Sequence, residues 1–390
     1  MGDETVTTLS INIRRIRTAR KLSQIDVAER AGLSRVGYRN VEDGEGEPKA
    51  ATVNAIARAL DVPIEQLLVP VRPLKRVRFR AQKKLHSREE VLATVARQLD
   101  HYEQLEELLG EKNRPAFAKV RKGIGALKGE ARALEAARRA REVFGLREQD
   151  SIRDICGLLE DHGVKVLTPA VATDGFFGLS VGDEDGGPAV AVNTWERISV
   201  ERWIFTAAHE LGHLLLHLDA YDVRKTDEND NEEKEADVFA SHFLVPESAF
   251  KKELEEAWGL SWYDRIFKLK RIFRVSYRSV LYRVASQLPQ EQRRNIWIQF
   301  NAEYKRKNAG RSLPGTVEPD GLPPDAFFRR PAERGAEEPE RLDRHDFMQD
   351  RLARLVRRAL EGDSITLGKA GEMLDLEMDE MRELANSWVE

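Results

Sequence analysis

The sequence has very little cysteine and no long hydrophobic run. Cys156 is the single cysteine among 390 residues, so no intrachain disulfide can form. One thiol also excludes a zinc ribbon, which needs several cysteine ligands. No stretch approaches the roughly 18 apolar residues of a membrane span, and residues 1–4 lack the basic and apolar regions of a signal peptide. We therefore expect a soluble, cytoplasmic protein with no membrane partner.

Charged residues are abundant in the sequence. Charged residues make up 33% of the chain, and hydrophobic residues, at 41%, are numerous enough for real cores. A chain of 390 residues exceeds one ordinary domain, so two or three are expected. The net charge of −4 is unevenly distributed, because acidic residues outnumber basic ones from about 150 to 250. The periodicities described below predict a multi-domain, mostly α chain.

Residues 9–68 have the spacing of five short helices. Ser23 is placed to cap the second helix, Gly32 ends it, and Ser34 is placed to cap a third helix over residues 35–42. The glycine allows the tight turn between these two helices. This pattern resembles the helix-turn-helix domain of the phage-repressor-like (XRE) family.

In that family the third helix lies in the major groove of DNA. Arginine can read guanine, asparagine can read adenine, and a valine side chain can contact the thymine methyl group. The resemblance therefore implies a double-stranded DNA operator as a partner, contacted through Gln24, Ser34, Arg35, Val36, Arg39 and Asn40. The alternative is a helical interaction module that has lost DNA binding. Whether the chain forms a homodimer is left open.

A strongly basic stretch over residues 71–84 follows this domain. It could track DNA phosphates beside the helix-turn-helix domain, or it could be a solvated linker. Residues 87–147 then have the spacing of long amphipathic helices, with an alanine-rich segment near their end. We interpret them as a helical spacer or as a helical layer against the next domain.

Three short strands are predicted after this spacer, over residues 164–167, 176–181 and 188–193. The loop over 183–187 ends in two glycines, which makes the last two strands a plausible hairpin. An extended substrate could pair with the strand around residues 190–193. A small sheet therefore precedes the stretch that carries the chemistry.

That stretch is an apolar, helix-forming run that contains His209, Glu210 and His213 in the order His-Glu-x-x-His. A helix advances by about 100° per residue, so both histidines project from one face. Two imidazoles so placed can bind one zinc ion, and Glu210 can deprotonate a zinc-bound water. The surrounding alanines and leucines indicate a buried helix, where ionisable side chains need a partner or a metal.

A catalytic zinc ion usually has a third protein ligand. His217 is excluded by length, because two helical turns separate it from His209 by about 12 Å, so we expect it beside the site. Glu233 and Asp237 share one face of a second predicted helix. Glu233 could ligate zinc, while Asp237 could orient a ligand histidine.

Other interpretations remain open on residue pattern alone. Glu235 is the fallback ligand, and His242 is better placed as a nearby polar group or a partly buried histidine. The charged run over 232–237 could instead be a solvated helix face. A donor for the oxyanion is also needed, and the candidates are His217, Tyr221 and His242.

These motifs together resemble the ImmA/IrrE family of zinc metallopeptidases. The resemblance covers about residues 152–288 and is carried by the segments 202–213, 233–240 and 244–246. It implies a gluzincin-type, α+β peptidase domain with one zinc ion per chain, whose ligands are His209, His213 and Glu233 and whose general base is Glu210. It also implies cleavage of a transcriptional repressor or related regulator, although here a repressor-like domain is fused to the same chain.

The last hundred residues carry weaker signals. Prolines and glycines between 314 and 331 predict an irregular connector, and residues 342–359 have helical spacing. Residues 364–376 resemble the first half of another small helix-turn-helix, and the residues from Glu377 onward would supply its second helix. We interpret this pair of helices as a protein-binding element. The predicted domains are a helix-turn-helix domain over 1–70, a basic linker and helical spacer over 71–148, a zinc peptidase domain over 149–290, an irregular connector over 291–340 and a small helical C-terminal element over 341–390.

Two functions from different classes follow from these features. The first is a DNA-binding transcriptional regulator fused to an active zinc endopeptidase that cleaves a regulator protein or itself. The second is a transcription factor or antitoxin whose metal domain senses a signal or binds a partner without protease activity. The complete His-Glu-x-x-His motif with a plausible third ligand favours the first.

Overall fold

The chain divides into two compact units. Unit 1 comprises Met1–Leu74 and Lys84–His101, and unit 2 comprises Lys75–Lys83 and Tyr102–Glu390. In this computed structural model, the residues described are 8–20, 22–45, 47–68, 74–81, 88–112, 115, 117–173, 175–218, 221, 229–314, 317–321 and 338–388.

Unit 1 contains the five predicted helices: α1 (Thr8–Ala19), α2 (Gln24–Arg30), α3 (Arg35–Glu42), α4 (Ala50–Ala59) and α5 (Ile64–Leu68). Ser23 and Ser34 cap α2 and α3, since each side-chain oxygen accepts a hydrogen bond from a backbone N–H in the first turn. Apolar side chains from all five helices form one core, in which Ile13, Tyr38 and Leu60 are fully buried.

A buried carboxylate, Glu42, ties the first three helices together. It lies at the end of α3 and accepts hydrogen bonds from Arg17 Nε at 2.7 Å, Tyr38 Oη at 2.6 Å and Gln24 Nε2 at 2.9 Å. Burial alone would raise the pKa of Glu42, but these hydrogen bonds outweigh it and the pKa is lowered. The charged carboxylate therefore fixes α1 and α2 against α3.

The sheet of unit 2 has four strands: β1 (Val77–Ala81), β2 (Lys165–Leu167), β3 (Phe176–Val181) and β4 (Ala189–Val192). Their order is β1-β3-β4-β2, with β1 and β4 antiparallel to β3 and β2 parallel to β4. The three predicted strands and the hairpin are present. The prediction that a substrate pairs with residues 190–193 is wrong, because β4 is an inner strand that is paired on both sides. The pattern of residue types along a strand does not reveal whether the strand lies inside the sheet or at its edge.

Strand β1 lies in the stretch that was interpreted as a phosphate-tracking segment or a solvated linker. Its backbone pairs with β3, with Val77 opposite Val181 and Arg80 opposite Gly178. Val77 is buried, and the side chain of Arg78 is only 12% exposed. Neither interpretation of the basic stretch included a strand, so this part of the sequence prediction is corrected.

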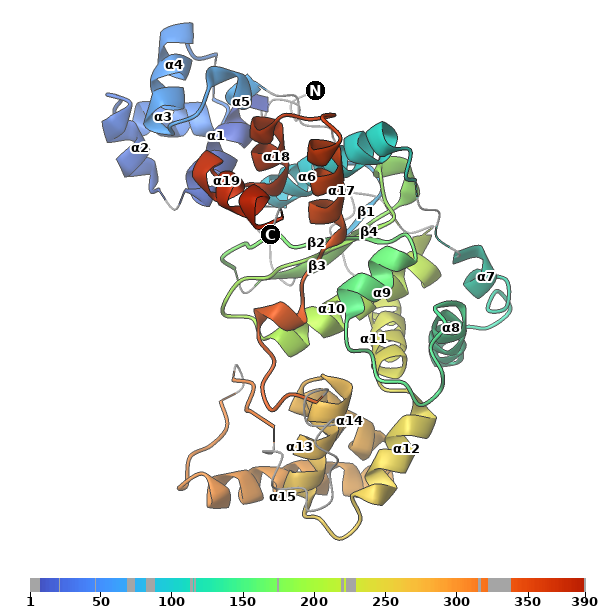
Figure 1. The fold of residues 1–390 in the computed structure, drawn as a ribbon. Coiled ribbons are helices and arrows are strands. Elements are labelled where there is room, and N and C mark those ends of the chain that lie inside the picture. Colours follow the sequence, from blue (N-terminus) through green and yellow to red (C-terminus); the bar gives the residue numbers. More distant parts are fainter. Residues whose placement is uncertain are drawn as a thin grey trace. The chain divides into compact units, whose positions relative to one another are not determined.

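Helices cover the sheet in layers. Helix α10 (Val200–Leu216) packs on β3 and β4, and α11 (Asp230–Leu244) packs on α10 (Figure 1). A Cβ atom on Gly212 of α10 would lie only 3.0 Å from the Phe239 ring, so a glycine here lets α11 approach closely. The predicted helical spacer is α6 (Arg88–Leu109), α7 (Phe117–Arg121) and α8 (Gly129–Val143), and α8 packs on α11.

The remaining helices of unit 2 are α9 (Ile155–Asp161), α12 (Glu247–Glu256), α13 (Trp262–Phe273), α14 (Tyr277–Ser286), α15 (Gln290–Lys307), α17 (Arg351–Glu361), α18 (Leu367–Leu374) and α19 (Met378–Ser387). The predicted connector over 291–340 is wrong in its first part, which is α15. Ile296 and Phe300 are its only fully buried pair, one turn apart, and so narrow a stripe gives a weak periodic signal.

The prediction of a helix over 342–359 is also corrected, because α17 begins only at Arg351. Upstream, the Asp343 carboxylate accepts the His345 backbone N–H, and the Asp346 carboxylate accepts that of Asp343. Such local side-chain bonds compete with helix formation. Within the described parts of the chain, no helix is long and apolar enough to cross a membrane.

Candidate metal centre

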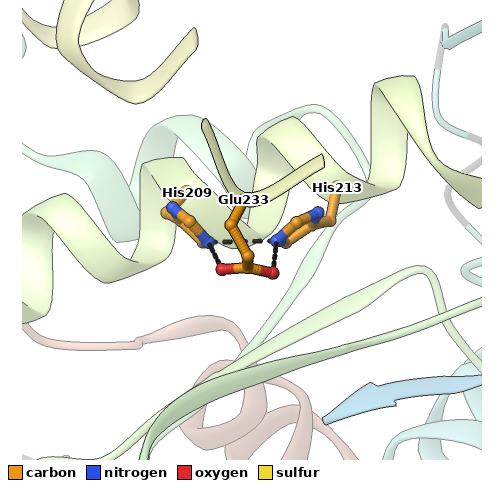
Figure 2. Close-up of side chains that lie close together, drawn as sticks. All are labelled: His209, His213 and Glu233. Atoms are coloured by element: carbon orange, nitrogen blue, oxygen red, sulfur yellow. Dashed lines mark hydrogen bonds and ion pairs between the residues drawn. The ribbon is translucent and has the colours of Figure 1, made fainter. Parts of the chain in front are cut away.

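Three side chains from two helices converge on one point (Figure 2). Nε2 of His209 lies 3.0 Å from Nε2 of His213, and the two nitrogens lie 3.3 and 3.2 Å from the two oxygens of Glu233. The histidines come from one face of α10, and Glu233 comes from the first turn of α11. The close approach of α11 at Gly212 brings the carboxylate within reach of both rings.

The second ring nitrogen of each histidine, Nδ1, contacts a side chain on the side away from the group of three. Nδ1 of His209 lies 2.8 Å from Oδ1 of Asp237, and a carboxylate there fixes the proton on Nδ1 and leaves the Nε2 lone pair for the centre. Nδ1 of His213 lies 3.0 Å from Nδ1 of His217, whose Nε2 lies 3.2 Å from Glu235. His217 and Glu235 therefore lie behind His213 and outside the group of three.

Burial and charge suit this group to a cation. His209 and His213 are 0% exposed and Glu233 is 8% exposed. Burial holds the pKa of His213 well below its usual value, which keeps the ring neutral. Burial alone would raise the pKa of Glu233, but its contacts with His209 and His213 outweigh this and lower it, so the carboxylate is charged. Two imidazoles and one carboxylate are a donor set that fits zinc.

Glu210 follows His209 on α10 and is 1% exposed. It lies against β3, because a Cβ atom on Gly178 would be 3.3 Å from its Cγ. The acid-base candidate is thus positioned between the helix that carries the histidines and the sheet. A side chain at position 178 would displace it.

Two other predicted site residues are engaged elsewhere. Tyr221 donates its hydroxyl hydrogen to Ser180 Oγ at 2.6 Å, and burial raises the pKa of the phenol, which stays protonated. His242 accepts a hydrogen bond from Arg283, and burial together with that guanidinium lowers the pKa of His242 to about 4. His242 and Asp237 line a cavity of about 890 Å³, which makes His242 a neighbour of the site rather than part of the ligand group.

Arg78 of β1 is a site residue that sequence reasoning missed. Its Nη2 donates to Oε1 of Glu233 at 3.1 Å, and its Nη1 donates to Glu232. The signal that could have found it is the alternation of apolar residues at 77, 79 and 81 with basic residues at 78 and 80, which is typical of a strand. The partner of that strand is about 100 positions away and could not be read from the pattern.

The predicted DNA-contacting residues divide into two groups. Arg35, Val36 and Arg39 are exposed on α3, with Val36 58% exposed, and Asn40 is partly exposed. Ser34 and Gln24 also make internal bonds, since Ser34 caps α3 and the Gln24 amide donates to Glu42.

Comparison with known families agrees with the description of the helix-turn-helix region and with that of the region that holds the candidate metal centre. Residues 13–67 match the family model described as helix-turn-helix, and residues 159–285 match the one described as IrrE N-terminal-like domain. A search of curated proteins found no match. The chain thus combines an XRE-type helix-turn-helix domain with an IrrE N-terminal-like domain of the ImmA/IrrE metallopeptidase kind.

Proposed function

We propose that this protein is a DNA-binding transcriptional regulator fused to a zinc-dependent endopeptidase that cleaves a regulator protein or itself. The observation that supports the peptidase most directly is the convergence of His209, His213 and Glu233 beside Glu210. The helix-turn-helix domain, with an exposed face on α3, supports the regulatory half and a cytoplasmic location.

The chain's residues have distinct tasks in this proposal. His209, His213 and Glu233 would hold one zinc ion, which would supply Lewis acidity toward a water molecule and a peptide carbonyl. Glu210 accepts the proton of the attacking water and returns it to the leaving amine. Asp237 keeps the proton of His209 on Nδ1, so that Nε2 remains the ligand atom.

A cavity beside the ligand group, lined by Asp237 but not by His209, Glu210, His213 or Glu233, could hold part of a protein substrate once the closed group becomes accessible. The cavity that Asp237 lines extends past Phe205, Val238 and Trp297, whose partly buried faces could receive apolar side chains. Arg202 of the same cavity stacks on Phe205 and could contact carbonyl oxygens of an extended chain. Of the three oxyanion donors predicted, none lies in the ligand group, so we assign none.

The experiment that tests the proposal compares wild type with Glu210→Gln. Both proteins are expected to contain one zinc ion per chain by elemental analysis, because Glu210 is not a proposed ligand. Each is incubated with the proteins encoded next to its gene, and fragments are identified by mass spectrometry, including fragments of the chain itself. Cleavage by wild type alone is expected. Zinc in both proteins with no fragments from either would instead favour a metal domain that senses or binds without cleaving.

A further inference from the structure

Strand β1 is an addition to the part of the chain that matches the IrrE N-terminal-like domain. Strands β2, β3 and β4 lie within the matched residues 159–285, whereas β1 lies at 77–81. Among the residues that the structure describes, it is the outer strand of the sheet and pairs with β3 alone. The chain therefore supplies from outside the matched domain the strand that covers the β3 edge.

That edge is the place where an extended peptide would reach Glu210. An added peptide strand gains main-chain hydrogen bonds from an open sheet edge. Gly178 of β3 rests against Glu210, and the residue paired with Gly178 is Arg80 of β1. The backbone of β1 thus occupies the position that would bring a substrate peptide group beside the acid-base residue.

Arg78 places a positive charge on the ligand group. It pairs with Ser180, and its guanidinium donates to Glu233 and Glu232. Because the side chain is 12% exposed, this contact is largely screened from water and its electrostatic effect is stronger than at the surface. A guanidinium on Glu233 competes with a divalent cation for the same carboxylate.

The candidate site is closed in this structure. His209, Glu210, His213 and Glu233 are 0, 1, 0 and 8% exposed. A peptide cannot reach side chains that are this deeply covered, so cleavage would require that something moves. Strand β1 contacts this group through Arg78, and in the described part of the chain its five residues are paired on one side alone.

The start of β1 is anchored by hydrogen bonds to unit 2, whereas the chain on both sides of Lys75–Lys83 belongs to unit 1. The backbone N–H groups of Lys75 and Arg76 both donate to Asp185, and Gly182 N donates to Arg76 O at 2.9 Å. Unit 2 includes only Lys75–Lys83 of this region, and the chain on either side belongs to unit 1. A change in unit 1 could therefore act on β1 through the covalent chain from both ends.

We propose that the segment Lys75–Ala81 is an internal, substrate-like strand that keeps the peptidase site closed until it is displaced, with Arg78 lowering the zinc affinity of the closed state. This inference rests on the proposed peptidase function. Its test therefore uses zinc binding and peptide binding, in addition to cleavage.

Zinc affinity is measured by chelator competition for wild type, Arg78→Ala and Arg76→Ala. Arg76 is the matched control, since it lies in the same segment but its guanidinium contacts Glu184 and the carbonyl oxygen of Tyr221 instead of Glu233. Arg78→Ala is expected to bind zinc about tenfold more tightly, the scale at which groups beside ligands affect affinity, and Arg76→Ala should match wild type. Weaker zinc binding by Arg78→Ala would show that Arg78 positions Glu233 for the metal. It would overturn the proposal that the Arg78 guanidinium competes with zinc for the Glu233 carboxylate.

Access is measured with a double variant, Phe79→Pro with Arg80→Pro. Alternate residues of an antiparallel strand donate toward the partner, so one of two adjacent prolines must remove a ladder donor. In a Glu210→Gln background, the zinc-loaded double variant should bind a fluorescent peptide of sequence Lys75–Lys83 at least about tenfold more tightly than the same protein with its own strand intact. Circular dichroism and the zinc content establish that the variant is folded.

The results separate the two proposals. If the double variant binds the peptide more tightly but neither it nor wild type cleaves any candidate, the closing strand stands and the peptidase fails. If wild type and the double variant cleave one substrate at equal rates and bind the peptide equally, the peptidase stands and the closing strand is refuted. Faster cleavage and tighter peptide binding by the double variant support both.

Discussion

Gly178 is the position where one methyl group should disturb the site most. A Cβ atom there would lie 2.5 Å from Cγ2 of Thr206 on α10 and 2.9 Å from the carbonyl oxygen of Ala191 on β4. Carbon atoms normally approach to about 3.5–4 Å, so the Thr206 methyl or the helix must move by about 1 Å. The backbone oxygen of Ala191 cannot rotate away, so β3 and β4 must also shift relative to each other, in addition to any movement of α10.

The expected cost of Gly178→Ala is the difference between two effects. Overpacking of this kind costs about 1–3 kcal/mol, whereas replacing glycine stabilises by about 0.4–1 kcal/mol through the unfolded chain. We therefore expect a net loss of about 1–2 kcal/mol. For a unit of this size, the loss corresponds to a Tm lower by about 2–8 °C in a thermal denaturation experiment.

A double-mutant cycle identifies the contact responsible. Thr206→Ser removes the methyl group that the new Cβ would strike and keeps the hydroxyl, so the two changes together should cost less than their sum by about 0.5–1.5 kcal/mol. Part of the loss should remain, because the Ala191 oxygen stays in place. Additive effects, or a Gly178→Ala protein as stable as wild type, would refute the close packing of β3 on α10.

Three further predictions concern other parts of the molecule. Asp237→Asn should weaken zinc binding about 10–100-fold in chelator competition, because His209 loses the carboxylate that fixes its proton. The pKa of His242 is lowered from 6.5 to about 4, so its contribution to the free energy of unfolding is complete above pH 6.5 and is lost as the pH falls toward 4. The loss amounts to up to about 3 kcal/mol. In denaturant titrations across this pH range, the stability of His242→Gln should fall less steeply than that of wild type. Arg35→Ala and Asn40→Ala should each weaken binding to the DNA upstream of the gene by about 5–150-fold in gel-shift titrations, and unchanged binding would contradict the placement of α3 in the groove.

Features that depend on short spacings were accessible from the sequence. The order around His209 and His213 requires one helical face, and Glu233 with Asp237 requires one face of a second helix, so both sets could be predicted from a period of 3.6 residues. The structure brings the three ligand atoms together, while their role as zinc ligands stays a prediction. The exclusion of His217 as a ligand rested on helix length, and the structure places it behind His213.

Features that depend on distant neighbours were not accessible. The closeness of α10 and α11 depends on Gly212 meeting Phe239, and the position of Glu210 depends on Gly178, neither of which a pattern within one element reveals. The strand at 77–81 was missed for the same reason, since its partner is about 100 positions away. The parallel pairing of β4 with β2 was missed because no turn between the two strands marks it. Helix α15 was missed because only Ile296 and Phe300 mark its buried side.

The place of β1 in the chain has a consequence for folding. Val77 pairs with Val181, so the outer strand is synthesised about 100 residues before the strand it joins. Closing so large a loop carries an entropic cost, and pairings of this kind form late and slowly. Until β1 joins, β3 presents unpaired backbone groups that can template pairing with another chain. A fragment that begins after residue 83 would retain this exposed edge permanently, and we expect it to aggregate more readily than the full-length protein.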